Sequence, residues 1–389
     1  MIKTSRKLNT VITYIATCLF WCSIYVYVPI LSTYCETLGS SYTMIGTILS
    51  SYGLVQLILR IPIGVFSDKI AKRKVFMVFG LLISIVSGLV FFFGKTPTEM
   101  LIGRSLAGVS AATWAIFMIN FGSLYPSSEQ SKSMGIVGTT TFIGQVVATF
   151  FGGLIATSFS EKTTFIVSAF VGLLAAVLIL LVSEKTTDNL IKPKMSDFFV
   201  MIKNKDLIYF SLLAVIMQIA VYSGVMGFIP NILKDLGGNN IVLGLSSAFA
   251  SLLSIPTSLL SGSFFENKVG FKVSLVASFS LVAIFLVLMG VTNSIPVILL
   301  LVLLTSAPRG VIQTMLNSLA IRGIKPSLRS AAASVFQSIY GLGMTIGPVL
   351  TGIIADNFGV TAAFIAVGIF TLLAVGILSF RKRWPEWVE

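Results

Sequence analysis

The sequence predicts an all-α membrane protein with twelve transmembrane helices in two parallel six-helix halves, related by a pseudo-two-fold axis along the membrane normal. Three observations predict this fold class. The 389 residues are 56% hydrophobic and 11% charged, with a mean hydropathy of +0.97, whereas about 25% of the residues in soluble domains are charged. Apolar runs of about 20 residues, long enough to cross a bilayer, recur along the chain. The second half also repeats sequence features of the first half.

Twelve apolar runs are the expected membrane spans, numbered here in chain order. The first run follows Lys3, Arg6 and Lys7, as in a signal peptide, but it is longer than a signal core and no small-residue cleavage site follows it. We therefore expect it to remain as the first span. The polar stretch 184–205 divides the chain into an N-terminal bundle (1–183), a cytoplasmic central loop and a C-terminal bundle (206–389). The expected spans are residues 10–32, 43–66, 75–94, 99–124, 134–159 and 163–183, then 206–232, 240–265, 271–290, 295–321, 331–355 and 360–380.

The distribution of Lys and Arg predicts that both termini lie in the cytoplasm. With that orientation, twenty-one of the 27 basic residues fall in cytoplasmic segments, and only Lys95, Lys162 and Lys234 fall in outside loops. Cytoplasmic loops of membrane proteins carry such an excess. The distribution also accounts for the net charge of +13 without a nucleic-acid partner, because the charge is spread over separate cytoplasmic segments.

Matching segments in the two halves predict the pseudo-symmetry. Gly46 corresponds to Gly244, the stretch 64–74 to 262–272, and the stretch 153–159 to 352–358, at offsets of 198 or 199 residues. Six spans separate the copies, an even number, so both halves have the same orientation. In transporters built from such parallel repeats, the cargo site lies between the halves near the membrane midplane, and access alternates by rocking.

Enzymatic and metal chemistry are not expected. The chain has no histidine, the commonest catalytic base and metal ligand. Its three cysteines, Cys18, Cys22 and Cys35, have neither a disulfide framework nor a metal-ligand spacing. No phosphate-binding Gly-rich loop ending in Lys-Ser or Lys-Thr is present, which argues against a primary pump. We therefore expect no cofactor and no enzyme.

The loop after the second span resembles the signature loop of a known family. Gly64, Asp68, Lys69 and Arg73 are similar to the Gly-x-Leu-Ala-Asp-Arg-x-Gly-Arg-Arg loop of the major facilitator superfamily, although Ala71 stands where the family usually has Gly.

Two further patterns extend the resemblance to the whole chain. Gly262 and Glu266 form a weaker copy of the loop in the second half. In the fourth span, Arg104, Gly108 and Ala112 match the family pattern Arg-x-x-x-Gly-x-x-x-Ala.

The resemblance implies gating roles. It suggests that Asp68 caps the N-terminus of the eleventh span, and pseudo-symmetry then suggests the fifth span for Glu266. A carboxylate at a helix N-terminus stabilises an exposed site by about 0.3–1 kcal/mol, so both latches would hold the cytoplasmic side closed. The predicted gating or coupling residues are Gly64, Asp68, Lys69, Arg73, Arg60, Arg104, Glu266, Glu36 and Asp356.

The short central loop and the twelve spans resemble the drug and metabolite exporters of the superfamily, the drug:H+ antiporter-like branch. Those antiporters usually carry Gly-x-x-x-Gly-Pro-x-x-Gly-Gly in the fifth span, where this chain has Gly144, Ala148, Thr149, Gly152 and Gly153. The small-residue face remains, which permits close helix packing. The Gly-Pro step is missing, so the pattern leaves other modes of transport open beside antiport.

Three arginines lie inside spans, where ionisable residues indicate function. Arg60 and Arg104 lie near enough to span ends to reach water by extending their side chains, or they pair with other groups in a structural role; a functional role is the alternative. Arg309 lies near the middle of the tenth span, after Pro308, and neither interface is within its reach. We expect it to face a water-filled cavity, where it contacts cargo or acts in gating; pairing with backbone carbonyls is the alternative.

The span cores contain no carboxylate in the sequence-based assignment, and Glu36 and Asp356 are the nearest, both towards the outside. An anionic cargo could therefore supply the counter-ion of Arg309. If protons drive transport, Glu36, Asp68 or Asp356 would carry them, or the cargo itself would. The predicted cargo-binding residues are Arg309, Gln313, Asn317, Tyr25, Trp21, Gln56, Trp114, Asn120, Gln145, Gln218, Tyr222, Gln337 and Tyr340.

The leading hypothesis is a secondary active transporter, a monomer in the lipid bilayer, that exports a small amphipathic, anionic metabolite or drug by proton antiport with alternating access. The alternative within transport is an importer or facilitator of an organic anion. An alternative of another class is a membrane sensor or scaffold that does not transport. The minimal loops favour the plasma membrane of a prokaryote.

Overall fold

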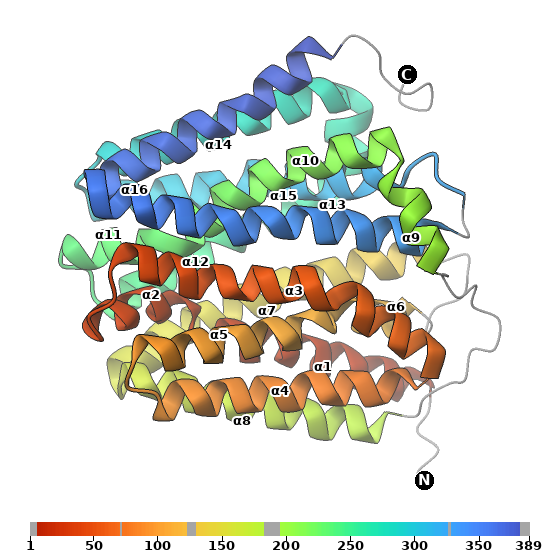
Figure 1. Ribbon diagram of the computed structural model, residues 1–389, viewed down its shortest axis with the longest axis horizontal. Coiled ribbons are helices and arrows are strands. Elements are labelled where there is room, and N and C mark those ends of the chain that lie inside the picture. Colours follow the sequence, from red (N-terminus) through yellow and green to blue (C-terminus); the bar gives the residue numbers. More distant parts are fainter. Residues whose placement is uncertain (1–5, 71, 123–129, 183–194, 326–327, 382–389) are drawn as a thin grey trace.

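The computed structural model describes residues 6–70, 72–122, 130–182, 195–325 and 328–381, without the side chains of residues 6, 7, 68, 122, 130–137, 195 and 330. All secondary-structure elements in these ranges are helices (Figure 1). Eleven helical stretches in them are long and apolar enough to cross a membrane, and the last, Ala331–Phe380, has 50 residues. Gly359, with a φ of +84°, interrupts that stretch, which therefore contains two spans. The predicted twelve-span fold is confirmed.

The first half forms the lower part of Figure 1, where α3 and α7 lie next to the second half. Its first and fourth spans are each broken into two helices. The elements are α1 (Arg6–Tyr25) and α2 (Val28–Thr37), α3 (Tyr42–Ile70), α4 (Arg73–Phe93), α5 (Pro97–Ala112) and α6 (Trp114–Gly122), α7 (Gln130–Ser158) and α8 (Glu161–Leu181).

The second half forms the upper part of Figure 1, with α16 and α12 next to the first half. Its seventh and eighth spans contain π-helical segments. The elements are α10 (Lys205–Ile219), η2 (Ala220–Phe228) and α11 (Ile229–Asp235), α12 (Asn240–Leu252), α13 (Ser254–Leu260) and η3 (Ser261–Val269), α14 (Phe271–Val291), α15 (Ile295–Ile321) and α16 (Arg329–Phe380).

Prolines account for two of the breaks inside spans. Pro29 lies in the first turn of α2, where its missing N–H is tolerated, so the helix restarts there instead of continuing from α1. Pro256 lies in the first turn of α13, and the eighth span breaks at Leu253, just before it. Such breaks leave backbone carbonyls free to bind side chains.

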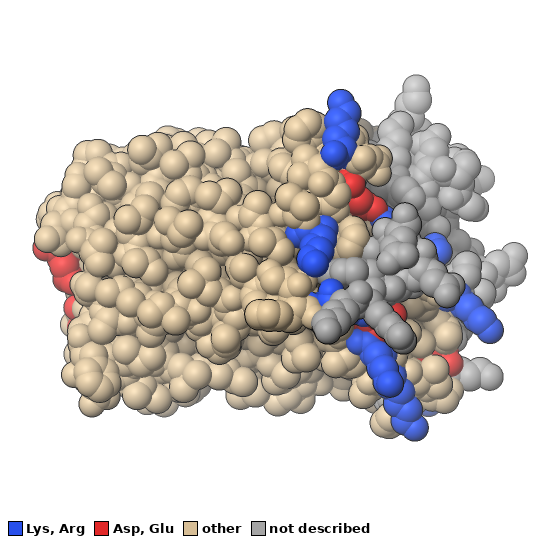
Figure 2. All heavy atoms as spheres, turned by 90° about the horizontal axis from the view of Figure 1, so that it is seen from above, with Lys and Arg blue, Asp and Glu red and all other residues tan. Residues whose placement is uncertain are grey.

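Charged side chains gather at the two ends of the elongated molecule. Helix α1 begins and α16 ends at the right of Figure 1, and Lys and Arg gather at that end in Figure 2. We call this the basic end, and we call the other end, where Figure 2 shows acidic side chains, the opposite end.

The two halves meet along two seams. Helix α3 packs against α16, and α7 packs against α12. Both seams require glycine, because a Cβ on Gly46 of α3 would clash with the Pro348 carbonyl oxygen of α16, and a Cβ on Gly153 of α7 would lie 2.7 Å from the Gly244 Cα of α12. The small-residue face expected in the fifth span therefore serves backbone contact between the halves.

One helix lies inside the polar stretch 184–205, where no element was expected. Helix α9 (Met195–Ile202) packs at the basic end against α16 and α10 (Figure 1). Its Phe198 and Met201 side chains are buried, whereas Phe199 is 63% exposed. Burial of these two apolar side chains on one face stabilises α9, which is too short to cross a membrane.

Candidate functional site

Arg104 and Arg309 lie inside spans, one in each half, in addition to Arg60 of α3, which is 5% exposed. Arg104 of α5 is 4% exposed, and Arg309 of α15 is half-buried. These helices belong to the fourth and tenth spans, which correspond to each other in the repeat. A charge at the membrane centre costs at least about 2.5–3.5 kcal/mol, so the partners of each guanidinium indicate what it is for.

Arg104 is held by tyrosine rings of its own half. Its Cζ lies 4.2 Å from the Tyr52 ring centroid and 6.0 Å from the Tyr27 ring centroid, and its Nη1 donates to the Tyr27 hydroxyl at 3.4 Å. Gly108, one turn further on, lets α5 approach α3, because a Cβ there would lie 2.8 Å from the Tyr52 carbonyl oxygen. A desolvated cation–π contact stabilises by about 2 kcal/mol. Aromatic faces thus take the place of a counter-ion for Arg104.

Arg309 lies at the break in the eighth span. Its Nη1 donates to the Ala250 carbonyl at 2.7 Å and to the Ser251 hydroxyl at 3.2 Å. The neighbouring Gly310 allows α15 to touch this break, since a Cβ there would lie 2.7 Å from the Ser254 Cα. Arg309 is therefore bound to backbone in this structure, and it lies where α15 meets α12.

A hydrogen-bonded chain leads from Arg309 to the first half. The Ser251 hydroxyl, which accepts from Arg309, donates to the Gln145 Oε1 of α7 at 3.1 Å. The Arg309 Cζ also lies 5.9 Å from the Phe142 ring centroid on the same helix. Ser251 is fully buried and Gln145 is 5% exposed. Any movement of Arg309 therefore acts on a contact between the two halves.

Aromatic side chains from both halves meet beside the two arginines. The hydroxyls of Tyr25 and Tyr222 lie 3.5 Å apart, and the Tyr52 and Tyr222 rings are stacked with centroids 6.3 Å apart. Trp21 continues the cluster, with ring centroids 5.7 Å from Tyr25 and 4.9 Å from Trp114. The Trp21 Nε1–H is buried and has no partner among the described atoms.

Several of the remaining predicted cargo-binding residues have hydrogen-bond partners within the protein. Gln56 accepts from Arg60 Nη2 at 2.5 Å, which gives Arg60 a structural partner. The amides of Gln218 and Gln313 lie 3.5 Å apart, and Asn317 donates to the Gln313 carbonyl of its own helix.

Asn120, Gln337 and Tyr340 are half-buried on α6 and α16. The Gln337 Oε1 is buried and has no partner among the described atoms. Tyr340 packs edge-on against Phe336, with ring centroids 5.5 Å apart. Of these three, the structure gives Gln337 alone an unfilled polar group.

Two predicted gating acids join the halves at the opposite end. Glu36 accepts from the Asn231 Nδ2 at 2.7 Å. Asp356 accepts from the backbone N–H groups of Tyr42 and Thr43 at 2.9 and 2.8 Å. Each contact links an acid of one half to a helix of the other half.

The predicted gating residues at the basic end have other surroundings. Glu266 pairs with Arg322 of its own half at 2.5 Å, and the side chains at the start of the fifth span, its predicted partner, lie outside the described residues. Lys69 is exposed, and the side chain of Asp68 lies outside the described residues.

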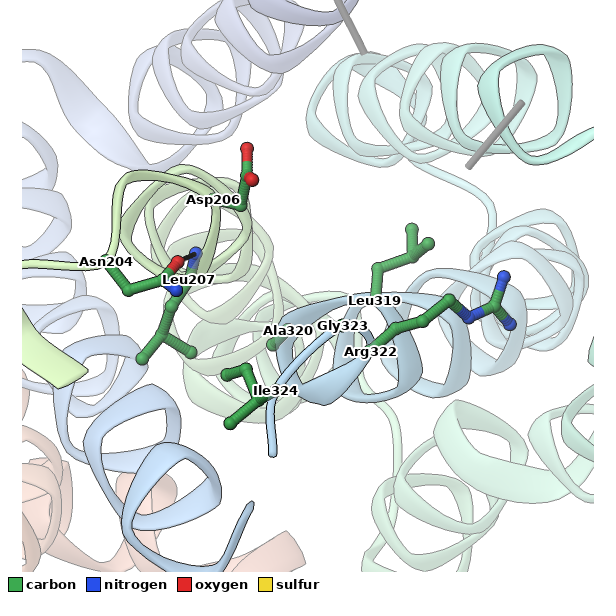
Figure 3. A pocket seen from close by; sticks show the side chains of 8 residues that line it. All are labelled: Asn204, Asp206, Leu207, Leu319, Ala320, Arg322, Gly323 and Ile324. Atoms are coloured by element: carbon green, nitrogen blue, oxygen red, sulfur yellow. Dashed lines mark hydrogen bonds between the residues drawn. The ribbon is translucent and has the colours of Figure 1, made fainter. Parts of the chain in front are cut away.

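Two small cavities lie at the basic end. The first, about 40 Å³, is lined by residues at the start of α10 and the end of α15, among them Asp206, Leu207, Leu319 and Arg322 (Figure 3). It has room for about three water molecules. The second, about 20 Å³, is lined by Arg60, Gly64 and Arg73 together with Phe198 of α9 and residues of α6 and α16. Each is too small for a cargo molecule.

The centre of the described structure is rich in hydrogen-bond donors. Arg104, Arg309, Trp21 and the tyrosine hydroxyls point to a ligand that supplies acceptors. Sequence analysis had not included Tyr27, Phe142 or Ser251 in the site. The position of Tyr27 in the first span, two residues after Tyr25, is a signal for it in the sequence, whereas a serine within a span gives no such signal.

Comparison with known proteins identifies the fold and its relatives. A model of the Major Facilitator Superfamily matches residues 13–223 and 211–386. An uncharacterized MFS-type transporter of Methanocaldococcus jannaschii is 26% identical over 364 residues, which cover 91% of this chain and 92% of the relative. Multidrug resistance protein 1 of Bacillus subtilis is 29% identical over 187 residues, 47% of this chain and 48% of that protein.

A solved structure has the same overall fold. A bacterial homolog of the human lysosomal transporter Spinster, in an inward-facing and unoccupied conformation, superposes with a TM-score of 0.80. The match covers 99% of this chain and 100% of the other at 15% identity, which establishes a common fold and no common cargo.

Proposed function

This chain belongs to the major facilitator superfamily of membrane transporters, and from that premise we propose that it exports a small amphipathic organic anion across the cytoplasmic membrane of a prokaryote. The observation that carries the proposal is the pair Arg104 and Arg309, one from each half, with neither guanidinium given a carboxylate partner among the described contacts.

Arg309 is the proposed contact for the anionic group. In this structure its Nη1 is satisfied by the Ala250 carbonyl and the Ser251 hydroxyl. A carboxylate or phosphate forms stronger, charge-assisted and often bidentate bonds with a guanidinium, so an anion can displace these neutral acceptors. The apolar part of the cargo would pack against Trp21, Tyr25 and Tyr222, where an unpartnered Trp21 Nε1–H also offers a donor.

Alternating access is supported by where the polar contacts between the halves lie. Glu36–Asn231 and Asp356–Tyr42 close the opposite end. At the basic end, the ion pairs Arg322–Glu266 and Arg381–Asp206 each join helices of one half. We place the basic end in the cytoplasm, as its Lys and Arg excess favours, and we propose that this arrangement is the state closed towards the outside.

Export by proton antiport is the finer part of the proposal. The multidrug resistance relative from Bacillus subtilis supports export. The proton carriers to test are Glu36, Asp68 and Asp356, or the cargo itself. Import or facilitated diffusion of an organic anion is the second candidate, and it is favoured by Ala148 and Thr149 at the place of the Gly-Pro step of antiporters.

The test is thermal stabilisation of the purified protein by three naphthalene compounds that differ in charge: 1-naphthoate, its methyl ester and 1-naphthylmethylamine. A ligand at 100 times its Kd adds about 2.7 kcal/mol to the stability of the native state. We expect naphthoate alone to stabilise the wild type and the control Arg322→Ala, and to lose its effect on Arg309→Ala.

Hits are then tested for counterflow in proteoliposomes. Equal stabilisation of wild type and Arg309→Ala by the ester or the amine would refute an anionic cargo. Folded protein that neither binds nor moves any compound of an extended anion panel would favour the non-transporting sensor or scaffold.

A further inference from the structure

The N-terminus of α3 is capped by a residue of the other half. The first N–H groups of a helix have no partner within the helix. In α3 the Tyr42 and Thr43 N–H groups donate to the two carboxylate oxygens of Asp356 at 2.9 and 2.8 Å, and the third, of Met44, donates to the Ser41 hydroxyl at 3.2 Å. A carboxylate also interacts favourably with the positive end of the helix dipole.

The rest of the α3–α16 seam is close. A Cβ on Gly46 would clash with the Pro348 carbonyl oxygen, and a Cβ on Gly352 would clash with the Tyr42 carbonyl oxygen. Asp356 lies one turn beyond Gly352 on the same helix. The Asp356 carboxylate therefore lies at the exposed end of the seam, whose other close contacts involve backbone atoms.

The symmetry-related seam lacks this cap. The repeat places Thr157 of α7 at the position of Asp356, and the Thr157 hydroxyl donates to the Gly153 carbonyl of its own helix at 2.9 Å. The N-terminus of α12 is capped locally, because the Asn239 Oδ1 accepts from the Val242 N–H at 3.1 Å. The α7–α12 seam thus combines glycine contact with the Ser251–Gln145 hydrogen bond, and beside it the partly exposed Lys234 and Glu161 form an ion pair at 3.6 Å. Among the described contacts, none places a group of the other half on the first N–H groups of α12.

We infer that Asp356 is a one-sided latch that holds the α3–α16 seam closed at the opposite end, while the glycine-lined α7–α12 seam stays together when the latch opens. A carboxylate cap can be lost to water and regained without repacking a side chain, which suits a contact that must break in each cycle. The inference does not depend on the charge of the cargo. It adds an outer latch to the cytoplasmic ones that the family loop predicts.

Two cysteine reporters, one in each seam, test the latch. Ser50 lies on the same face of α3 as Gly46 and Gly53, and it is 4% exposed. Ser247 lies on the face of α12 that carries Gly244, and it is 1% exposed. Ser50→Cys and Ser247→Cys are made after replacement of Cys18, Cys22 and Cys35. Each cysteine is labelled with a membrane-impermeant maleimide. The reagent is dilute enough that labelling is slower than opening and closing of the seam, so the labelling rate is proportional to the fraction of molecules with that seam open.

We expect Asp356→Ala to raise the labelling rate of Ser50→Cys about 2- to 30-fold, the effect of losing a helix N-cap, and that of Ser247→Cys less than 2-fold. Thr157→Ala, the symmetry-matched control, and Asn357→Ala, the neighbouring control, should change neither rate. Unchanged gel filtration and thermal unfolding show that the variants are folded. An unchanged Ser50→Cys rate would overturn the latch, and an equal rise at both reporters would overturn its one-sidedness.

Discussion

Replacing Arg309 by Met tests whether this arginine is present for cargo or for structure. The guanidinium loses hydrogen bonds to the Ala250 carbonyl and the Ser251 hydroxyl, and bonds that involve a charged group contribute about 1.5–3 kcal/mol. Removing a central arginine also relieves about 2.5–3.5 kcal/mol of insertion cost. The two terms nearly cancel, so the unfolding free energy of Arg309→Met without cargo should lie within about 2 kcal/mol of wild type.

The assay is unfolding of the purified, cargo-free protein in mixed micelles, followed by helical circular dichroism. Gln313→Met is the matched control, because it places the same side chain one turn along the same helix without removing a charge. A loss of about 4 kcal/mol or more, beyond that of the control, would refute the reasoning. It would mean that Arg309 holds the break of the eighth span, and that its charge is structural.

Three further predictions concern contacts between and within the halves. Gly153→Ala should destabilise the protein by about 1–3 kcal/mol because a Cβ has no room in the α7–α12 seam, whereas Gly138→Ala on the same helix, which has open space, should be neutral or stabilising in the same thermal unfolding assay. A double-mutant cycle of Ser251→Ala and Gln145→Leu should give a coupling of about 0.6–1.7 kcal/mol for the hydrogen bond between the halves, and a coupling of zero would contradict the geometry. Glu266→Gln should cost less than about 1 kcal/mol because its arginine partner is 36% exposed, and the difference from wild type should shrink in 1 M salt; a larger, salt-independent loss would contradict this.

Much of the fold could be predicted because each spanning helix must satisfy its own backbone and bury an apolar length fixed by the bilayer. The expected boundaries lie close to those observed, and Gly359 accounts for the turn between spans eleven and twelve. The break at Leu253 was not predicted, although Pro256 signals it in retrospect. Helix α9 was missed because its apolar residues occupy a single short stretch between lysines.

Less of the site could be predicted, because its contacts join helices that are distant in sequence. The sequence places Arg309 beyond the reach of either membrane interface, and pairing with backbone carbonyls is one of the roles that it predicts for this side chain. Its partner could not be identified, since Ala250 lies on another span, far from Arg309 in the sequence. For Arg104 the sequence left extension towards water, structural pairing and a functional role open, and it could not indicate the faces of Tyr52 and Tyr27 on which the structure places the guanidinium.

The guanidinium groups of Arg104 and Arg309 have an electrical consequence. Each elementary charge that crosses the whole of a 100 mV membrane potential changes the free energy by about 2.3 kcal/mol. In the proposed cycle the centre opens to one side of the membrane at a time and takes the electrical potential of that side. Arg104 and Arg309 therefore cross part of the membrane potential when the empty carrier changes state. With the basic end at the negative side of the membrane, the voltage favours the arrangement described here, closed at the opposite end. An anion bound to Arg309 lowers the charge from two to one, so the potential would drive the loaded and the empty carrier by different amounts.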